Sequence, residues 1–136
     1  MATKMIGFTY KPKIEGVRVG SIRQTIRLGR RIDLNDKLIL FAWSGKPYRS
    51  PWAWRLYEVA NEVVPVKIYQ WGIISLHPYF LLNNMGGLST PWDHPRMDEL
   101  AKLDGIDPPT GKELGRLLLS MHKIGPEGEE AQIIRW

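Results

Sequence analysis

Residues 44–52 combine basic and aromatic side chains in a stretch that is rich in turn-forming residues. The stretch reads Ser-Gly-Lys-Pro-Tyr-Arg-Ser-Pro-Trp, and its candidate ligand contacts are Lys46, Tyr48, Arg49 and Trp52. Unstacked bases bind to aromatic faces beside cationic groups, and each stacked base contributes about 1–3 kcal/mol. Because binding residues are often carried on exposed loops, we expect this stretch to be a ligand-facing loop.

Positive charge is concentrated in the first half of the chain. The whole chain has 19 Lys and Arg against 14 Asp and Glu, a formal net charge of +5. Residues 1–55 hold 12 of the basic and 3 of the acidic residues, which gives +9, whereas residues 56–136 carry −4. This asymmetry favours a polyanion-binding face, and its candidate contacts include Arg23, Arg27, Arg30 and Arg31. The alternative is a solvated basic surface that has no partner.

Composition excludes several classes of site. The 136 residues include no cysteine, which rules out disulfides, cysteine-ligated zinc, iron–sulfur clusters and a cysteine nucleophile. The histidines His77, His94 and His122 lack metal-ligand spacing, and Asp93-His94 near Asp98 fits a solvated loop better than a metal site. We therefore predict no metal site and no cofactor.

Length and hydropathy favour one small domain, residues 1–136. No apolar run approaches the ~20 residues of a membrane span, and the N-terminal residues lack the apolar core and cleavage site of a signal peptide. We therefore expect a soluble, cytoplasmic protein without a membrane partner. The sequence leaves the oligomeric state open.

Hydrophobic patterning predicts mostly strands, with two helices late in the chain. Strands are expected at residues 5–10, 37–43, 52–62, 63–69, 71–76 and 131–136, with an interruption at Pro65. Residues 77–95 predict a long loop, and helices are expected at 96–103 and at 108–122, where Asp107 is the cap. Trp43, Trp71 and Trp136 are expected in the core. The pattern favours an α+β, mostly β fold, a small and partly open barrel with two or three short helices at one side.

Residues 20–27 (GSIRQTIR) resemble G-x-K-x-x-T-x-R, the signature of ASCH domains, whose fold is a PUA-like β-barrel. Further features follow in the order typical of that family. They are a strand after a turn at residues 35–40, an acid-bearing strand at 57–63, Asp104-Gly105-Ile106 before a helix, and a final strand that ends in Ile-Arg-Trp. The resemblance therefore covers essentially the whole chain.

The resemblance implies a nucleic-acid-related role, because ASCH and PUA-like barrels hold RNA, DNA or a single base in a cleft. A small bacterial ASCH group hydrolyses N4-acetylcytidine with the motif Lys, the motif Thr and a later Glu. By position, Thr25 and Arg27 match the motif and Glu58 matches the strand Glu, but the Lys position is Ile22. An isoleucine cannot transfer a proton, and the neighbouring Arg23 is a weak general base because its guanidinium stays charged.

The sequence thus predicts a module that binds RNA or single-stranded DNA in a basic cleft. The alternative is a hydrolase of a modified nucleoside, with Thr25 and Glu58 as catalytic residues. A threonine nucleophile needs an adjacent base, which Glu58 supplies only within hydrogen-bond reach. A third reading is an accessory protein in a larger assembly, in which the basic half serves solubility or docking.

Overall fold

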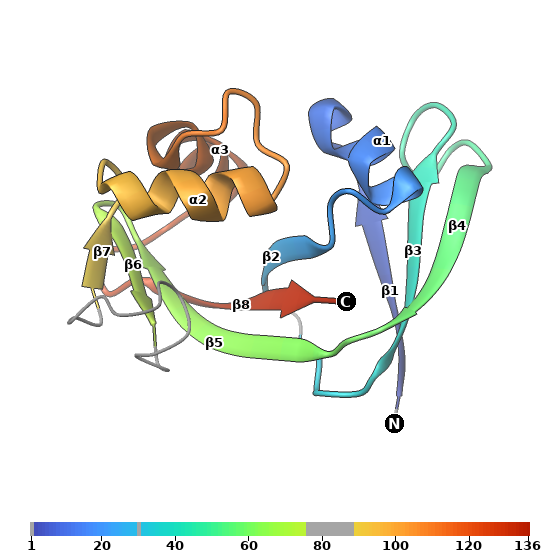
Figure 1. Ribbon diagram of the computed structural model, residues 1–136, viewed down its shortest axis with the longest axis horizontal. Helices are drawn as coiled ribbons and strands as arrows, with labels where there is room; N and C mark the ends of the chain where they lie inside the picture. The colour runs from blue at the N-terminus through green and yellow to red at the C-terminus, as the bar shows by residue number, and fades with distance from the viewer. Residues whose placement is uncertain (1, 30, 76–88) are drawn as a thin grey trace.

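The structure, a computed structural model, describes residues 2–29, 31–75 and 89–136 and contains two β-sheets (Figure 1). The first sheet has the strand order β1-β3-β4, with β1 parallel to β3 and β3 antiparallel to β4. Its strands are β1 (Thr3–Phe8), β3 (Lys37–Trp43) and β4 (Trp52–Val59). Alternating burial along β4 shows that one face of this sheet packs inward and the other faces outward.

The second sheet is antiparallel throughout the described residues, in the order β2-β8-β5-β6-β7. Its strands are β2 (Gln24–Leu28), β5 (Glu62–Tyr69), β6 (Gly72–Ser75), β7 (Ser89–Pro91) and β8 (Glu129–Arg135). The expected α+β, mostly β class is confirmed, but the described pairings form two sheets and no closed barrel. The break between β4 and β5 falls at residues 60–61 and not at Pro65, which lies inside β5. Pro65 stands just before the point, Val66, at which the described pairing of β5 with β6 begins.

Three helices lie on one side of the sheets: α1 (Lys11–Val19), α2 (Pro95–Leu103) and α3 (Gly111–Met121) (Figure 1). The first is not among the helices expected from the sequence, and Pro12 lies in its first turn, a position that suits proline. The expected Asp107 cap is wrong, because the hydroxyl of Thr110 accepts the backbone N–H of Glu113 at 3.1 Å. Asp107 instead precedes a cis peptide bond to Pro108.

Two hydrophobic cores lie on opposite faces of the second sheet. Ile133 of β8 belongs to the core beneath α2 and α3, and its neighbour Ile134 belongs to the core shared with the inner face of the first sheet. This alternation follows from the two-residue period of a strand. Trp136 is buried as expected, whereas Trp43 is half-buried and Trp71 is 46% exposed, so the core expectation is wrong for Trp71.

Part of the expected loop at residues 77–95 is ordered structure. Residues 89–91 form β7, and His94 begins α2 by accepting the backbone N–H of Arg96 at its Nδ1. Residues 77–88, including His77, lie outside the described residues. Within the part of the chain that the structure describes, no helix has the length and apolar character needed to cross a membrane.

Candidate functional site

A pocket of about 210 Å³ lies between the end of β1, α1, β2 and α3. Its polar wall carries Lys13, Thr25, Arg27 and Asp104. Its apolar wall carries Ile106, Leu114, Leu117, Leu118 and Met121, so the leucines of α3 serve both the core and the pocket. Pockets with an apolar wall and a few convergent polar groups are typical binding sites. Since drug-sized ligands need roughly 300–1,000 Å³, this pocket has room for a smaller group.

Thr25 and Arg27 reach the pocket together because they are two residues apart on β2, on one face of the strand. The Nε of Arg27 donates to the hydroxyl oxygen of Thr25 at 3.1 Å. Its Nη2 donates to the carbonyl oxygen of Gly7 at 2.8 Å, and its guanidinium lies 5.1 Å from the centre of the Phe8 ring. These contacts hold the guanidinium at the edge of β1 and fix the orientation of the threonine hydroxyl.

A buried ion pair joins α1 to the end of α2 at the same pocket. The Nζ of Lys13 lies 3.2 Å from Oδ2 of Asp104, and their side chains are 6% and 7% exposed. The amide of Gln24 donates to the other carboxylate oxygen at 3.4 Å. Burial lowers the pKa of Lys13, against the attraction of Asp104, and the positive charge of Arg27 lowers it further. Burial likewise raises the pKa of the Asp104 carboxyl, against the attraction of Lys13.

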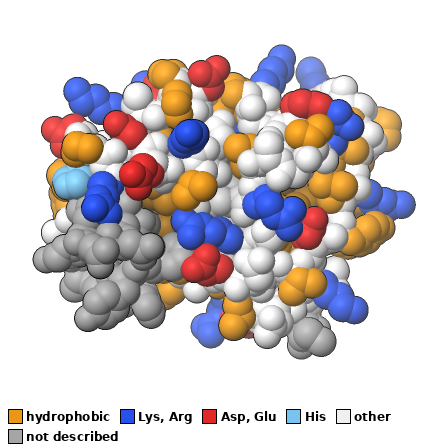
Figure 2. All heavy atoms as spheres, in the orientation of Figure 1, with side chains coloured by type: hydrophobic (Ala, Val, Ile, Leu, Met, Phe, Trp, Pro, Cys, Tyr) orange, Lys and Arg blue, Asp and Glu red, His pale blue; other side chains and the backbone are white. Residues whose placement is uncertain are grey.

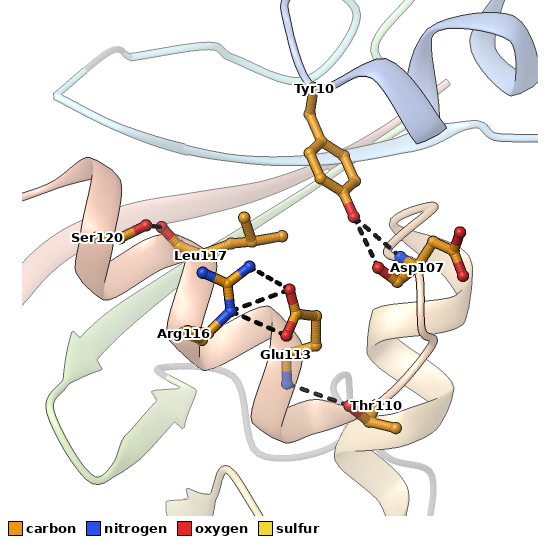
Figure 3. A network of polar contacts seen from close by, with 7 residues as sticks. All are labelled: Tyr10, Asp107, Thr110, Glu113, Arg116, Leu117 and Ser120. Atoms are coloured by element: carbon orange, nitrogen blue, oxygen red, sulfur yellow. Dashed lines mark hydrogen bonds and ion pairs between the residues drawn. The ribbon is translucent and has the colours of Figure 1, made fainter.

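Tyr10 closes one side of the pocket by joining α1 to the loop between α2 and α3 (Figure 3). Its hydroxyl donates to the carbonyl oxygen of Asp107 and accepts the backbone N–H of the same residue, both at 3.1 Å. On the facing helix, Glu113 and Arg116 form an ion pair beside Leu117, and Arg116 holds the pKa of the Glu113 carboxyl below its usual value (Figure 3). The pocket thus lies between elements that are tied to each other by hydrogen bonds.

The two residues expected to form a catalytic pair lie apart. Thr25 lines the pocket, and Glu58, on β4, does not. The Glu58 carboxylate lies 3.4 Å from Nη2 of Arg23. The Nε of the same arginine donates to the backbone carbonyl oxygen of Trp136 at 2.7 Å. Ile22, at the motif lysine position, packs against the second core and leaves no room for a Cβ at Gly16.

The remaining sequence candidates that the structure describes lie away from this pocket. Lys46, Tyr48 and Arg49 are exposed in the turn between β3 and β4, and Trp52 begins β4 half-buried. Arg31 is exposed, pairs with Asp33 at 3.2 Å and borders a separate, more open pocket of about 610 Å³. Arg30 lies outside the described residues.

Within residues 2–29, 31–75 and 89–136, no three His, Asp or Glu side chains come together as a metal site would require. His94 caps α2, and Oδ1 of Asp98 accepts the backbone N–H of Gly111 at 2.8 Å. His94 and Asp98, for which a solvated loop was expected, therefore each accept a backbone N–H group at the start of a helix.

Sequence reasoning missed Lys13 and Asp104, the two buried charges of the pocket. They lie on α1 and just after α2, so no local spacing connects them. One signal in the sequence was available. Positions 14 and 17 are apolar and lie on the buried face of the segment after Pro12, a spacing that indicates a helix. With that helix recognised, Lys13 would face inward beside Val17, as a charged residue on a buried face that needs a partner.

Comparison with known proteins found no match: no family model, curated protein or solved structure matches this chain.

Proposed function

We propose that this chain is a nucleic-acid-binding module that holds a single strand, RNA or DNA, and takes one base into the pocket of Thr25 and Arg27. The observation that carries the proposal is the two-sided wall of this pocket, polar on the side of β2 and α1 and apolar on the side of α3. A base offers a hydrogen-bonding edge and an apolar face, and recognition of single strands uses both. A volume of about 210 Å³ suits one such group rather than a length of strand.

The ASCH resemblance contributes the nucleic-acid class to this proposal. The motif residues Thr25 and Arg27 line the pocket side by side, in keeping with a shared binding role. The motif lysine is replaced by the apolar Ile22, and the described strands do not close into the PUA-like barrel of that family. The proposal therefore takes the ligand class from the resemblance, and takes the site from the pocket.

Fluorescence anisotropy with labelled eight-nucleotide RNA and DNA, at a series of salt concentrations, tests the proposal. Affinity should fall as salt rises, with a slope near −0.7 for each phosphate contact to a single strand. The Thr25→Val substitution keeps the shape of the buried side chain and removes its hydroxyl. It should weaken binding by about threefold to tenfold, the effect of one lost hydrogen bond.

The matched control is Thr90→Val, because Thr90 is as buried as Thr25 (both 2% exposed) and lies on β7, away from the pocket. This variant should bind as tightly as the unaltered chain. The absence of any binding at low salt would refute the proposed function, and equal affinities of the two variants would refute the pocket as the base site.

A hydrolase acting on a modified nucleoside is the second candidate, and one observation favours it. Thr25 shares the pocket with Lys13, an amine whose pKa is lowered by burial, and a less basic amine is better suited to accept the hydroxyl proton. In such an enzyme the base is Lys13, because Glu58 does not line the pocket. Incubation with N4-acylated cytidines and chromatography of the products tests this activity, and turnover that survives Thr25→Ala rules out threonine as the nucleophile.

A further inference from the structure

The outer face of the β1-β3-β4 sheet carries a connected group of aromatic rings. Phe41 stacks on Trp52 with ring centres 4.2 Å apart and an interplanar angle of 20°, and it meets Trp43 edge-on at 5.3 Å. Trp43 in turn contacts Tyr48 at 5.1 Å. We call these four residues, together with Tyr57 and Arg55, the platform.

The register of the strands places these side chains on one face. Phe41 pairs with Arg55, Ile39 pairs with Tyr57, and a bulge between Ala42 and Trp43 brings Trp43 opposite Trp52. Directly paired residues of antiparallel strands point to the same side, so the bulge turns Trp52 outward beside its neighbours. The strands therefore place the platform residues on one face, except Tyr48, which the turn between β3 and β4 carries.

Several rings of the platform remain open to solvent. Tyr48 is 88% exposed and Tyr57 is 69% exposed, whereas Trp43 and Trp52 are half-buried. Figure 2 shows hydrophobic side chains standing beside Lys and Arg side chains along the edge of the molecule that β4 forms at the right. Exposed aromatic rings grouped in this way mark an interaction surface more often than a solvated one.

The charge of this face is of one sign. Arg55 lies 6.0 Å from the ring centre of Trp52, and the platform is bordered by Lys37, Lys46 and Arg49, all of them exposed. The three strands and the 44–51 turn are fully described, and none of their outward-facing residues is acidic. A partner that suits this face carries negative charge and flat apolar groups together, which is the chemistry of a single-stranded nucleic acid.

The platform is continuous with the pocket at Gly7. The ring of Phe41 lies so close to Gly7 that a Cβ atom there would stand 2.9 Å from its Cζ. The carbonyl oxygen of the same glycine accepts the guanidinium of Arg27, and Gly7 lines the pocket. Gly7 therefore borders both the pocket and the platform, so the two are adjacent across β1.

We propose that the platform is a stacking surface for the bases of a single strand that continues from the pocket, an inference that rests on the proposed function. Tyr48 and Tyr57 stack bases through their exposed rings, and Arg55, Lys46 and Arg49 contact phosphates. The pocket selects one base, and the platform contributes affinity that does not depend on base identity, because every base has a π-face.

The test uses fluorescence anisotropy with labelled oligouridylate and oligothymidylate of eight nucleotides. Tyr48→Asn is suited to the positive φ of 65° at this position, and Tyr57→Thr keeps a residue favoured in strands. Each should weaken binding by about fivefold or more, up to about 150-fold, the range for one lost stacked base. Trp71→Thr is the matched control, an exposed aromatic residue outside the platform, and should leave affinity unchanged.

An eight-unit abasic sugar–phosphate oligomer separates stacking from charge. It should bind more weakly than the oligonucleotides and should respond to neither tyrosine substitution. If the unaltered chain binds oligonucleotides and both tyrosine variants bind as the Trp71→Thr control does, the platform is wrong and the proposed function stands. If the unaltered chain binds no oligonucleotide, both are wrong. Dimerisation in sedimentation experiments that both tyrosine substitutions abolish would instead make this face a contact between copies, and would also overturn the platform.

Discussion

The Lys13–Asp104 ion pair offers a sharp test of the pocket, because both charges are almost wholly withdrawn from water. Lys13→Met leaves a buried carboxylate without its cation, and Asp104→Asn leaves a buried ammonium without its anion. Breaking a buried pair by removing one partner costs about 3–5 kcal/mol. A chain of this size has a total stability of about 5–15 kcal/mol, so each variant should fold but lose a large part of its free energy of unfolding.

The double variant Lys13→Met/Asp104→Asn should be more stable than either single variant, since it buries no net charge. With single losses of about 3–5 kcal/mol and a double loss of about 2 kcal/mol, the coupling energy is at least about 4 kcal/mol. Urea unfolding at pH 7, followed by tryptophan fluorescence, measures all four free energies. The exposed Arg31–Asp33 pair is the control, and Arg31→Met should change the free energy of unfolding by less than about 1 kcal/mol.

The pH dependence of the Lys13→Met variant provides a second readout. Burial raises the pKa of the Asp104 carboxyl, and without the ammonium nothing of like strength opposes that shift. The folded variant then binds more protons than its unfolded chain, so its stability should fall as pH rises above about 4, the usual value of an aspartate. A double-variant loss equal to the sum of the single losses, together with an unchanged pH profile, would refute the assignment of a coupled buried pair.

Three further perturbations test the packing that positions the site. Gly115→Ala would place a Cβ atom 2.6 Å from Cδ2 of Trp92 and should cost about 1–3 kcal/mol in urea unfolding, whereas Gly125→Ala, with its nearest neighbour at 3.8 Å, should cost less. Thr110→Ala removes the cap of α3 and should lower the free energy of unfolding by about 1 kcal/mol, while Thr110→Ser should retain most of it; equal losses would refute the capping role. Two backbone N–H groups hold the pKa of Asp36 below its usual value, so the stability that they contribute is present above about pH 4 and is lost as pH falls further. Thermal melts from neutral to acid pH should therefore show a flatter acid limb for Asp36→Asn, and an unchanged limb would contradict this role.

Most of the strands could be predicted because their signal is local, but β2 and β7 were not among those expected. The apolar stretch at 37–43 and the closing stretch at 131–136 correspond to β3 and β8 within a few residues. The same reasoning failed at α1, where Pro12 is compatible with either the end of a strand or the first turn of a helix. Local sequence does not decide between them; the burial of Val17 against the first sheet does.

The candidate site was predictable only where its residues share a strand. Thr25 and Arg27 reach one pocket because two-residue spacing on β2 places them on one face. Glu58 was expected beside them from its place in the order of elements, but β4 belongs to the other sheet. The platform depends on the bulge before Trp43, a pairing irregularity that no residue type in this stretch signals.

The structure also changes where the positive charge of the first half can act. Four of its cations are matched by carboxylates: Lys13 by Asp104, Arg18 by Glu15, Arg23 by Glu58 and Arg31 by Asp33. None of the ion pairs among the described residues includes the cations that border the platform, Lys37, Lys46, Arg49 and Arg55. A carboxylate in contact with a cation competes with a phosphate for it, so a polyanion gains more from the second group. The salt dependence of binding should therefore arise mainly at the platform, and the discrimination between bases at the pocket, where Lys13 is already paired with Asp104.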